Sequence, residues 1–222
     1  EQLFFNGLLR GLQTLNFNYD IHDLQSNGLE ALLKYKQLWV VTTEFMDGGT
    51  QSLLVQYVKK GGHLVIYPAI PTFDTYLNPC TILKDELNIP FTKSASPKKV
   101  DAFDIEDVFT LMEEKQVFRM NGGETVSTTK AGEVCGLRKQ VDKGVITALG
   151  YAFGYTTDEH LQVYEKIAAF DNIKREAKVS DPEIQFVIRK GKKYSYLFLL
   201  NYHNEKKTFT VDSKKFTLNP LS

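Results

Sequence analysis

Residues 37–71 read QLWVVTTEFMDGGTQSLLVQYVKKGGHLVIYPAIP, and this stretch decides the fold class. The runs 38–41 and 63–67 are short, apolar and rich in β-forming residues, which indicates strands buried on both faces. Between them Asp47 can cap a helix, and the glycine pair 61–62 can end it. Two buried strands joined through a helix predict a right-handed crossover in a parallel sheet.

The residues before this stretch continue the alternation of helix and strand. A first helical face is formed by four apolar residues: Phe4, Leu8, Leu12 and Leu15. Tyr19–His22 predicts a strand, and residues 29–33 predict a short helix. The alternation is typical of an open, doubly wound α/β layer. Because a helix that opens such a layer normally follows a strand, we expect a first strand upstream of Glu1, in a longer protein.

The second half of the chain shows a different pattern. Turn signals at 121–123 and 142–144 predict β-hairpins, followed by a last sheet strand at 145–149. Thr157 or Asp158 can then cap a closing helix, whose buried face starts at Leu161.

The last forty residues predict β structure without a helix. Three strands are expected at 184–189, 194–201 and 208–211. The domain prediction has three parts: an α/β domain at 1–172, a polar linker at 173–182 and an incomplete antiparallel β domain at 183–222.

Composition excludes several classes of function. Lys+Arg and Asp+Glu both number 27, so the formal charge is zero, which argues against nucleic acid or an anionic membrane as the main partner. Apolar runs stay well short of the roughly 18 residues of a spanning helix. Cys80 and Cys135 form no disulfide framework and are expected to be reduced, structural thiols, which favours a cytoplasmic location.

The loop after the second strand is where this kind of fold places a nucleophile. Here it reads Tyr67-Pro-Ala-Ile-Pro71, without Ser, Cys or a flanking glycine, so the nucleophile elbow is absent. Cys80 has no nearby histidine in the sequence to lower its pKa, and Cys135 falls in a predicted strand. We expect both thiols to be packed rather than catalytic.

Metal and cofactor sites are also not indicated. The four histidines share no ligand spacing, and His203-Asn-Glu205 fits a solvated turn better than a catalytic pair. The acidic run 101–107 lacks the order of a calcium loop and is expected to be a solvated face. Glycine-rich phosphate loops are missing. We therefore expect no cofactor, no metal and no catalytic residue in the chain.

Several segments resemble a known family. Residues 36–41 and 56–66, with the following Pro68 and Pro71-Thr72, resemble the non-catalytic glutamine-amidotransferase-like domain of bacterial β-galactosidases. The continuation 78–84 resembles large members grouped with glycoside hydrolase family 35. Residues 196–202 and 209–211 are similar to the small β domain that follows in such enzymes.

The resemblance implies an open, mostly parallel, flavodoxin-like or class I amidotransferase-like sheet flanked by helices, followed by a small antiparallel β domain. It further implies a parent β-galactosidase whose catalytic (β/α)₈ barrel lies upstream and whose subunits form a homo-oligomer. No position here matches the catalytic motif, so no catalytic residue is carried over.

Three hypotheses follow for the function. The first is a structural, oligomer-forming accessory part of a β-galactosidase, inert alone. The second is a diverged amidotransferase-like hydrolase that uses Cys80. The third is a carbohydrate-binding module. Its candidate ligand or interface surface consists of five residues: Tyr67, Phe73, Asp74, Tyr76 and Tyr155.

Overall fold

The structure is a computed structural model that describes residues 2–94, 98–111, 117–175, 177–181 and 183–220. Two positions of the predicted linker, 176 and 182, lie outside the described residues. The helices are α1 (Gln2–Thr14), α2 (Leu29–Leu32), α3 (Gly48–Lys59), α4 (Ile82–Glu86) and α5 (Asp158–Ala169). The first strands are β1 (Gln37–Thr42), β2 (His63–Pro68), β3 (Phe91–Ser94), β4 (Lys99–Ala102), β5 (Ile105–Phe109) and β6 (Val117–Met120). They are followed by β7 (Glu124–Thr129), β8 (Val134–Val141), β9 (Gly144–Leu149), β10 (Ile184–Lys190), β11 (Ser195–Asn201), β12 (Lys207–Val211) and β13 (Lys214–Leu218).

Seven strands form the main sheet, in the order β1-β2-β9-β8-β7-β4-β5. The strands β1, β2 and β9 run parallel, and every other neighbouring pair is antiparallel. The sheet is therefore mixed, and the prediction of a mostly parallel sheet is wrong. The cause is local: the turn at 142–143 between β8 and β9 is far too short for a parallel crossover.

The strand–helix–strand unit at 37–71 is confirmed. The Asp47 side chain accepts the backbone N–H of Thr50 and caps α3. The helix ends before Gly61, whose φ of 114° suits a residue without a side chain. Strand β2 then pairs with β1 in parallel register, from Gln37 opposite His63 to Thr42 opposite Pro68.

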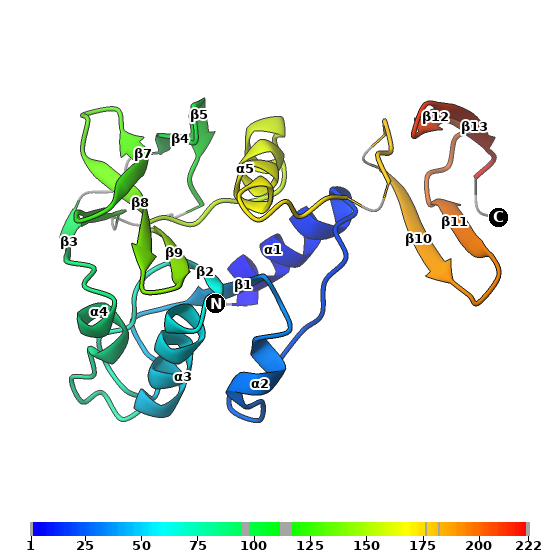
Figure 1. Cartoon of the computed structure of the whole chain (residues 1–222). Helices are drawn as coiled ribbons and strands as arrows, with labels where there is room; N and C mark the ends of the chain where they lie inside the picture. The colour runs from blue at the N-terminus through cyan, green and yellow to red at the C-terminus, as the bar shows by residue number, and fades with distance from the viewer. Residues whose placement is uncertain (1, 95–97, 112–116, 176, 182, 221–222) are drawn as a thin grey trace.

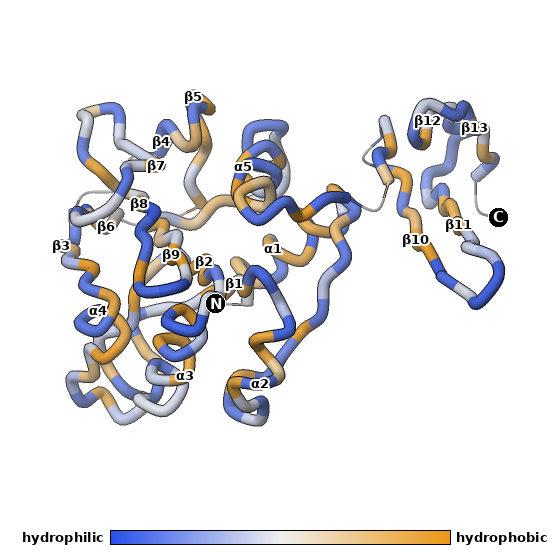
Figure 2. Tube along the Cα trace, in the orientation of Figure 1, coloured by the Kyte–Doolittle hydropathy of each residue, from blue (hydrophilic) through white to orange (hydrophobic). Residues whose placement is uncertain are grey.

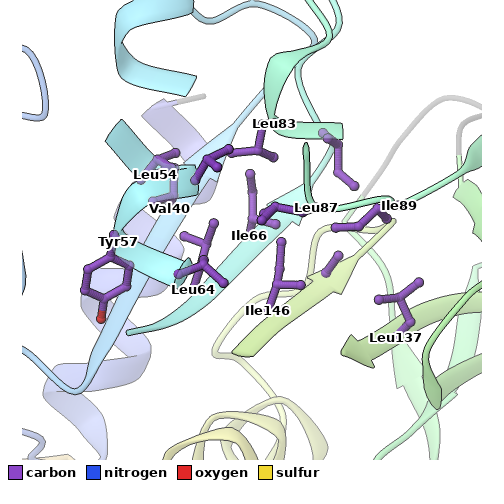
Figure 3. Close-up of a cluster of buried hydrophobic side chains, with 14 of the residues drawn as sticks. Val40, Leu54, Tyr57, Leu64, Ile66, Leu83, Leu87, Ile89, Leu137 and Ile146 are labelled. Atoms are coloured by element: carbon purple, nitrogen blue, oxygen red, sulfur yellow. The ribbon is translucent and has the colours of Figure 1, made fainter. Parts of the chain in front are cut away.

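Two hydrophobic layers cover the two faces of this sheet. On one face Leu64 and Ile66 of β2 contact side chains of α3 and α4, and Figure 3 shows them beside Ile146 of the neighbouring strand. On the other face Val65 and Tyr67 of β2 pack under α1 and α5. Because side chains alternate along a strand, one apolar run supplies both layers.

The C-terminal part consists of two hairpins, β10–β11 and β12–β13, which lie apart from the main sheet in Figure 1. They share a small hydrophobic cluster of their own: Ala177, Val179, Ile184, Phe209 and Val211. Figure 2 shows hydrophobic colour along β10 although this hairpin is largely exposed. The three predicted strands are present, and β13 is an additional one. The predicted boundary at 173–182 stays a prediction.

Three further details differ from or complete the sequence prediction. Tyr19–His22 is not a strand and lies in the irregular segment between α1 and α2. The turn at 121–123 joins β6 to β7, which pair with different partners, so it closes no hairpin. Within the described residues, no helix is long and apolar enough to cross a membrane.

Candidate functional site

The carboxyl ends of β1, β2 and β9 form the edge where open α/β sheets usually bind ligands. Residues 68–71 after β2 and 150–154 after β9 are all buried. The rings of Tyr67 and Phe153 lie 5.1 Å apart in this layer. The carboxyl ends of β2 and β9 are therefore closed by buried, mainly apolar residues, and the segment that follows β2 offers no nucleophile.

The five candidate surface residues are not brought together in one site. Tyr67 is completely buried, so it presents no ring to a ligand. Phe73 is half-buried and lies 6.0 Å from Phe45, ring to ring. Tyr76 is 84% exposed and Tyr155 38% exposed. Among the described ring contacts, none joins Tyr155 to Phe73 or Tyr76.

Asp74 shapes the loop that carries Tyr76. Its carboxylate accepts the backbone N–H groups of Tyr76 and Asn78, each at 2.8 Å. The Asn78 side-chain amide and backbone N–H hold the pKa of Asp74 below its usual value. A carboxylate that is satisfied by its own loop organises a turn, and this arrangement leaves Tyr76 and Leu77 projecting from it.

Cys80 also has a structural environment. Its backbone N–H donates to Thr72, and its carbonyl accepts from the buried side chain of Gln51, at 3.0 Å. The Gln51 carbonyl oxygen in turn accepts the backbone N–H of Leu83 at the start of α4. The loop is thus pinned by backbone contacts, and no described contact places a histidine or carboxylate beside the thiol. Cys135 is fully buried, and burial raises its pKa to about 12.

Sequence reasoning missed a carboxylate–imidazole–hydroxyl alignment. His63 Nδ1 lies 2.5 Å from Asp171 Oδ2, and His63 Nε2 lies 2.8 Å from Thr147 Oγ1. The partners are 108 and 84 residues away, which no local motif reveals. The Gln37 amide adds a bond to Asp171 at 2.6 Å.

This alignment resembles a catalytic triad only in its order of groups. Thr147 is completely buried in β9 and His63 is 2% exposed, so no substrate can reach the hydroxyl. The cavity nearest to Gln37 is not lined by His63 or Thr147. The network therefore ties the end of α5 to the amino ends of the parallel strands.

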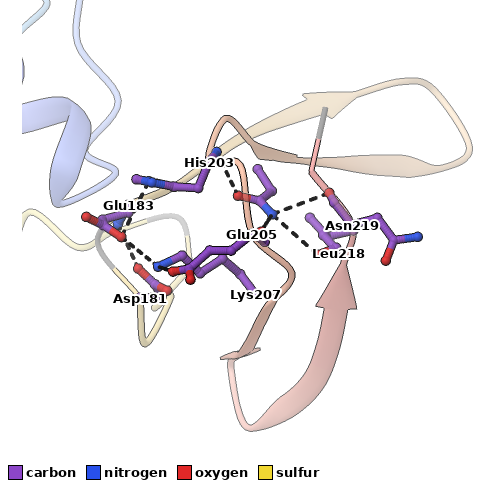
Figure 4. A network of polar contacts seen from close by, with 8 residues as sticks. Asp181, Glu183, His203, Glu205, Lys207, Leu218 and Asn219 are labelled. Carbon is purple, nitrogen blue, oxygen red and sulfur yellow. Dashed lines mark hydrogen bonds and ion pairs between the residues drawn. The ribbon is translucent and has the colours of Figure 1, made fainter. Parts of the chain in front are cut away.

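Several other charged groups form surface ion pairs. Lys130 bridges Asp101 at 2.6 Å and Asp107 at 2.8 Å, in the acidic run that was expected to be solvated. In the C-terminal part, Figure 4 shows Glu183 between His203 and Lys207. Across the described part of the chain, no group of three or more His, Cys, Asp or Glu side chains is arranged to hold a metal.

The chain matches a known family over more than half of its length. Residues 1–125 match the family described as "GLMA-like, second domain". The chain belongs to this family.

Curated relatives share the sequence over almost the whole chain. A β-1,2-glucosyltransferase from Ignavibacterium album is 53% identical over 209 residues, which cover 94% of this chain and 29% of that protein. An exo-β-D-glucosaminidase from Pyrococcus horikoshii is 30% identical over 207 residues, which cover 90% of this chain and 26% of that protein. The chain thus spans less than a third of either relative.

Solved structures share the fold at low sequence identity. A family 42 β-galactosidase from G. stearothermophilus, solved as a catalytic mutant, aligns with a TM-score of 0.77 and 12% identity, covering 98% of this chain and 34% of that one. A β-galactosidase from Rahnella sp. aligns with a TM-score of 0.76 and 14% identity, covering 98% of this chain and 35% of that one. These matches support the resemblance to β-galactosidases at the level of fold alone, and the expected grouping with glycoside hydrolase family 35 stays a prediction.

Proposed function

We propose that this chain is a non-catalytic part of a larger enzyme that acts on β-linked glucosyl groups. The observation that carries the proposal is the closed carboxyl edge of the parallel strands, where residues 68–71 and 150–154 are buried and apolar. Folds of this kind normally place their reactive groups at the carboxyl ends of the parallel strands. In this chain the residues at these ends pack against one another instead.

The substrate class follows from the relatives. The 53% identity with a β-1,2-glucosyltransferase is far higher than the 12% identity with a β-galactosidase, which supports only a shared fold. We therefore propose a β-1,2-linked glucosyl substrate for the whole protein. The β-galactosidase activity expected from the sequence is the second candidate.

The partners in this proposal are the catalytic barrel of the same protein and further copies of the subunit. Two adjoining loops, at 43–47 and 72–80, expose the apolar side chains of Phe45, Tyr76 and Leu77. Their exposed fractions are 44%, 84% and 68%. Exposed apolar groups gathered on neighbouring loops are typical of a surface covered in an assembly.

The two thiols support a cytoplasmic location, which we propose for the whole protein. Cys80 and Cys135 are both unpaired in the structure. Unpaired thiols are typical of proteins kept in a reducing compartment. Recovery of the natural protein in the soluble cytoplasmic fraction of its host supports this location, and recovery outside the cell contradicts it.

The activity test compares the purified chain of residues 1–222 with the natural protein that contains it. Both are assayed with β-1,2-linked glucooligosaccharides and with an aryl β-galactoside. We expect no turnover by the chain and turnover of the glucosyl substrate by the longer protein. Turnover by the chain alone contradicts the non-catalytic role, and turnover of only the galactoside contradicts the glucosyl substrate.

A matched variant tests the alternative hypothesis, in which the protein is a hydrolase that depends on Cys80. Cys80→Ser in the longer protein changes one atom in the loop whose backbone is held by Gln51 and Thr72. We expect its activity to stay within about twofold of the parent's, since about 0.4 kcal/mol of barrier change corresponds to that factor. Loss of activity, with the protein still folded, would support a catalytic thiol.

A further inference from the structure

The charges of the chain are distributed unevenly along its length. Of the 27 basic residues eight lie in 183–222, whereas of the 27 acidic residues only three do, so this part carries five excess positive charges in a chain of zero formal charge. The excess is densest in the hairpin β10–β11, because residues 184–202 contain four Lys or Arg and no Asp or Glu. A local excess of one sign attracts partners of the opposite sign, whatever the total charge of the chain.

One face of this hairpin lies outside the small hydrophobic cluster of the C-terminal part. The other face packs against that cluster through three side chains: Phe186, Ile188 and Leu199. Because side chains alternate along a strand and paired residues share a face, the pairing register identifies the residues of the free face. This outer face consists of six residues: Gln185, Val187, Arg189, Tyr196, Phe198 and Leu200.

The outer face is open to solvent and carries two aromatic side chains in line. Tyr196 is 57% exposed, Phe198 52% and Val187 40%. The two aromatic residues are two positions apart on β11, which sets them about 7 Å apart. Arg189 lies directly opposite Tyr196, is exposed, and within the described residues pairs with no carboxylate. The outer face is therefore an aromatic platform with one guanidinium beside it.

The bend at 191–194, which joins β10 to β11, adds positive charge next to this platform. Figure 2 shows the bend in hydrophilic colour. Lys192 and Lys193 are exposed there, and neither forms an ion pair within the described part of the chain. Glu183 and Glu205, by contrast, both pair with Lys207. The positive charge at the bend is therefore not neutralised by the described residues.

We infer that the outer face and the bend bind an acidic polysaccharide, a chain of sugar rings that carries carboxylate, sulfate or phosphate groups. Tyr196 and Phe198 pack by dispersion against the C–H faces of two sugar rings. Arg189 donates paired hydrogen bonds to one anionic group, and Lys192 and Lys193 attract further ones. Binding of this kind goes beyond the proposed function, because it needs neither the catalytic barrel nor turnover.

The order of side chains along the hairpin argues against a membrane surface as the partner. Segments that lie in a membrane interface bury their apolar side chains deeper than their charged ones. In this hairpin the order is reversed, since Lys192 and Lys193 occupy the bend and Tyr196 and Phe198 follow further along β11.

The density of charge argues against single-stranded nucleic acid. Such a strand carries a phosphate for every base, and its binding proteins combine stacking rings with a positively charged groove along the backbone. Of the six outer-face residues only Arg189 is charged, and the two unpaired lysines gather at one end. One cation beside two rings matches a sugar chain with more widely spaced acidic groups.

Calorimetric titration of the natural protein that contains this chain tests the inference. The probes are dextran sulfate and polygalacturonate, with uncharged dextran as the matched control. We expect saturable binding of the acidic polymers that weakens roughly tenfold between about 50 and 300 mM salt, and no binding of dextran. Binding of neither acidic polymer overturns the inference. Tighter binding of a single-stranded oligonucleotide or of phosphatidylserine vesicles also overturns it.

A matched pair of tyrosine variants tests the role of the platform. Tyr196→Ser removes one ring of the outer face, and Tyr202→Ser removes a ring of similar exposure, 59% against 57%, from the segment after β11. In the natural protein we expect Tyr196→Ser to weaken binding of dextran sulfate about fivefold, and Tyr202→Ser to change it less than about twofold. Equal effects of the two substitutions overturn the inference.

A matched pair of charge reversals tests the role of the bend. Lys192→Glu with Lys193→Glu changes the net charge by the same amount as Lys214→Glu with Lys215→Glu, and all four lysines are exposed. We expect the reversal at the bend to weaken binding of dextran sulfate at least about tenfold, and the reversal on β13 less than about threefold. Equal losses overturn the inference, because net charge alone then attracts the polymer. No result here depends on turnover, so the proposed function can stand or fall separately.

Discussion

Strands β1 and β2 are two apolar strands of six residues each, paired with each other, yet their surroundings differ. Every residue of β2 is buried, whereas four of the six residues of β1 are partly exposed. The difference arises from position: β2 lies between β1 and β9, and β1 lies at the edge. The apolar sequence of β1 is thus typical of a central strand, although among the described strands it pairs with β2 alone.

The carboxyl edge of the same strands shows the opposite condition. There the fold usually stays open for ligands, and here it is closed by buried residues. The buried segments after β2 and β9 indicate that the carboxyl ends of these strands serve packing, whereas β1 at the edge of the sheet stays partly exposed.

The strongest test of the contrast between the strands uses one substitution at two positions. Val65→Ala in β2 and Val41→Ala in β1 remove the same atoms from the same face of the sheet. We expect Val65→Ala to lower the free energy of unfolding by about 2–3 kcal/mol, because it leaves a cavity in a closed core. Val41→Ala should cost about 1 kcal/mol. Urea denaturation measures both, and equal losses would remove the distinction between the strands.

The crossover that joins the two strands depends on the cap of α3. The Asp47 carboxylate accepts the Thr50 N–H at 2.9 Å and the Thr50 hydroxyl at 2.6 Å. We expect Asp47→Ala to lower the free energy of unfolding by about 1 kcal/mol. Asp47→Asn keeps an oxygen acceptor and should cost less. If both variants cost the same in urea denaturation, the cap is not the source of the effect.

The closed carboxyl end contains a titratable group, His160. It is 1% exposed, and burial lowers its pKa. The folded protein therefore binds this proton less readily than the unfolded chain. The contribution of the neutral His160 to the free energy of unfolding is fully present above the unfolded-state pKa of about 6.5. It is lost as the pH falls toward the lowered folded-state pKa. Urea denaturation at pH 7.5 and pH 5.5 should show this loss, and His160→Gln should reduce it. An unchanged pH dependence in the variant assigns the loss to other groups.

The smallest effect is expected on the loop outside the closed edge. Tyr76 is 84% exposed, so Tyr76→Ser should change the free energy of unfolding by less than about 0.5 kcal/mol. In the natural protein the same variant should weaken subunit association, which analytical ultracentrifugation measures. Unchanged association together with unchanged stability would show that this loop is no interface.

The sequence predicted the parts of the fold that local signals determine. The signals for the β1–α3–β2 unit all lie within 35 residues: the cap at Asp47, the helix end at Gly61 and the apolar runs on either side. This unit could therefore be predicted directly from the sequence. The burial of Tyr67 could also have been predicted, because it lies two residues after Val65 and shares its covered face.

Other features depend on contacts that no local pattern contains. Tyr19–His22 carries a strand pattern but forms no strand, since none of the described strands pairs with it. The His63–Asp171 contact joins residues far apart in sequence. The last strand, β13, was missed because two lysines begin it and its side chains are largely exposed, which hides the alternation of a buried strand.

If the carboxyl edge of this domain packs rather than binds, its backbone amides will not respond to sugar. A ¹⁵N-labelled chain of residues 1–222, titrated with a β-1,2-linked glucose disaccharide, tests it most directly. The backbone amides of residues 72–80 and 150–155 report on this edge, and on the loops that carry Tyr76 and Tyr155. We expect no saturable shift at these amides up to millimolar sugar. Saturable shifts confined to these residues would contradict it and would establish a carbohydrate-binding surface.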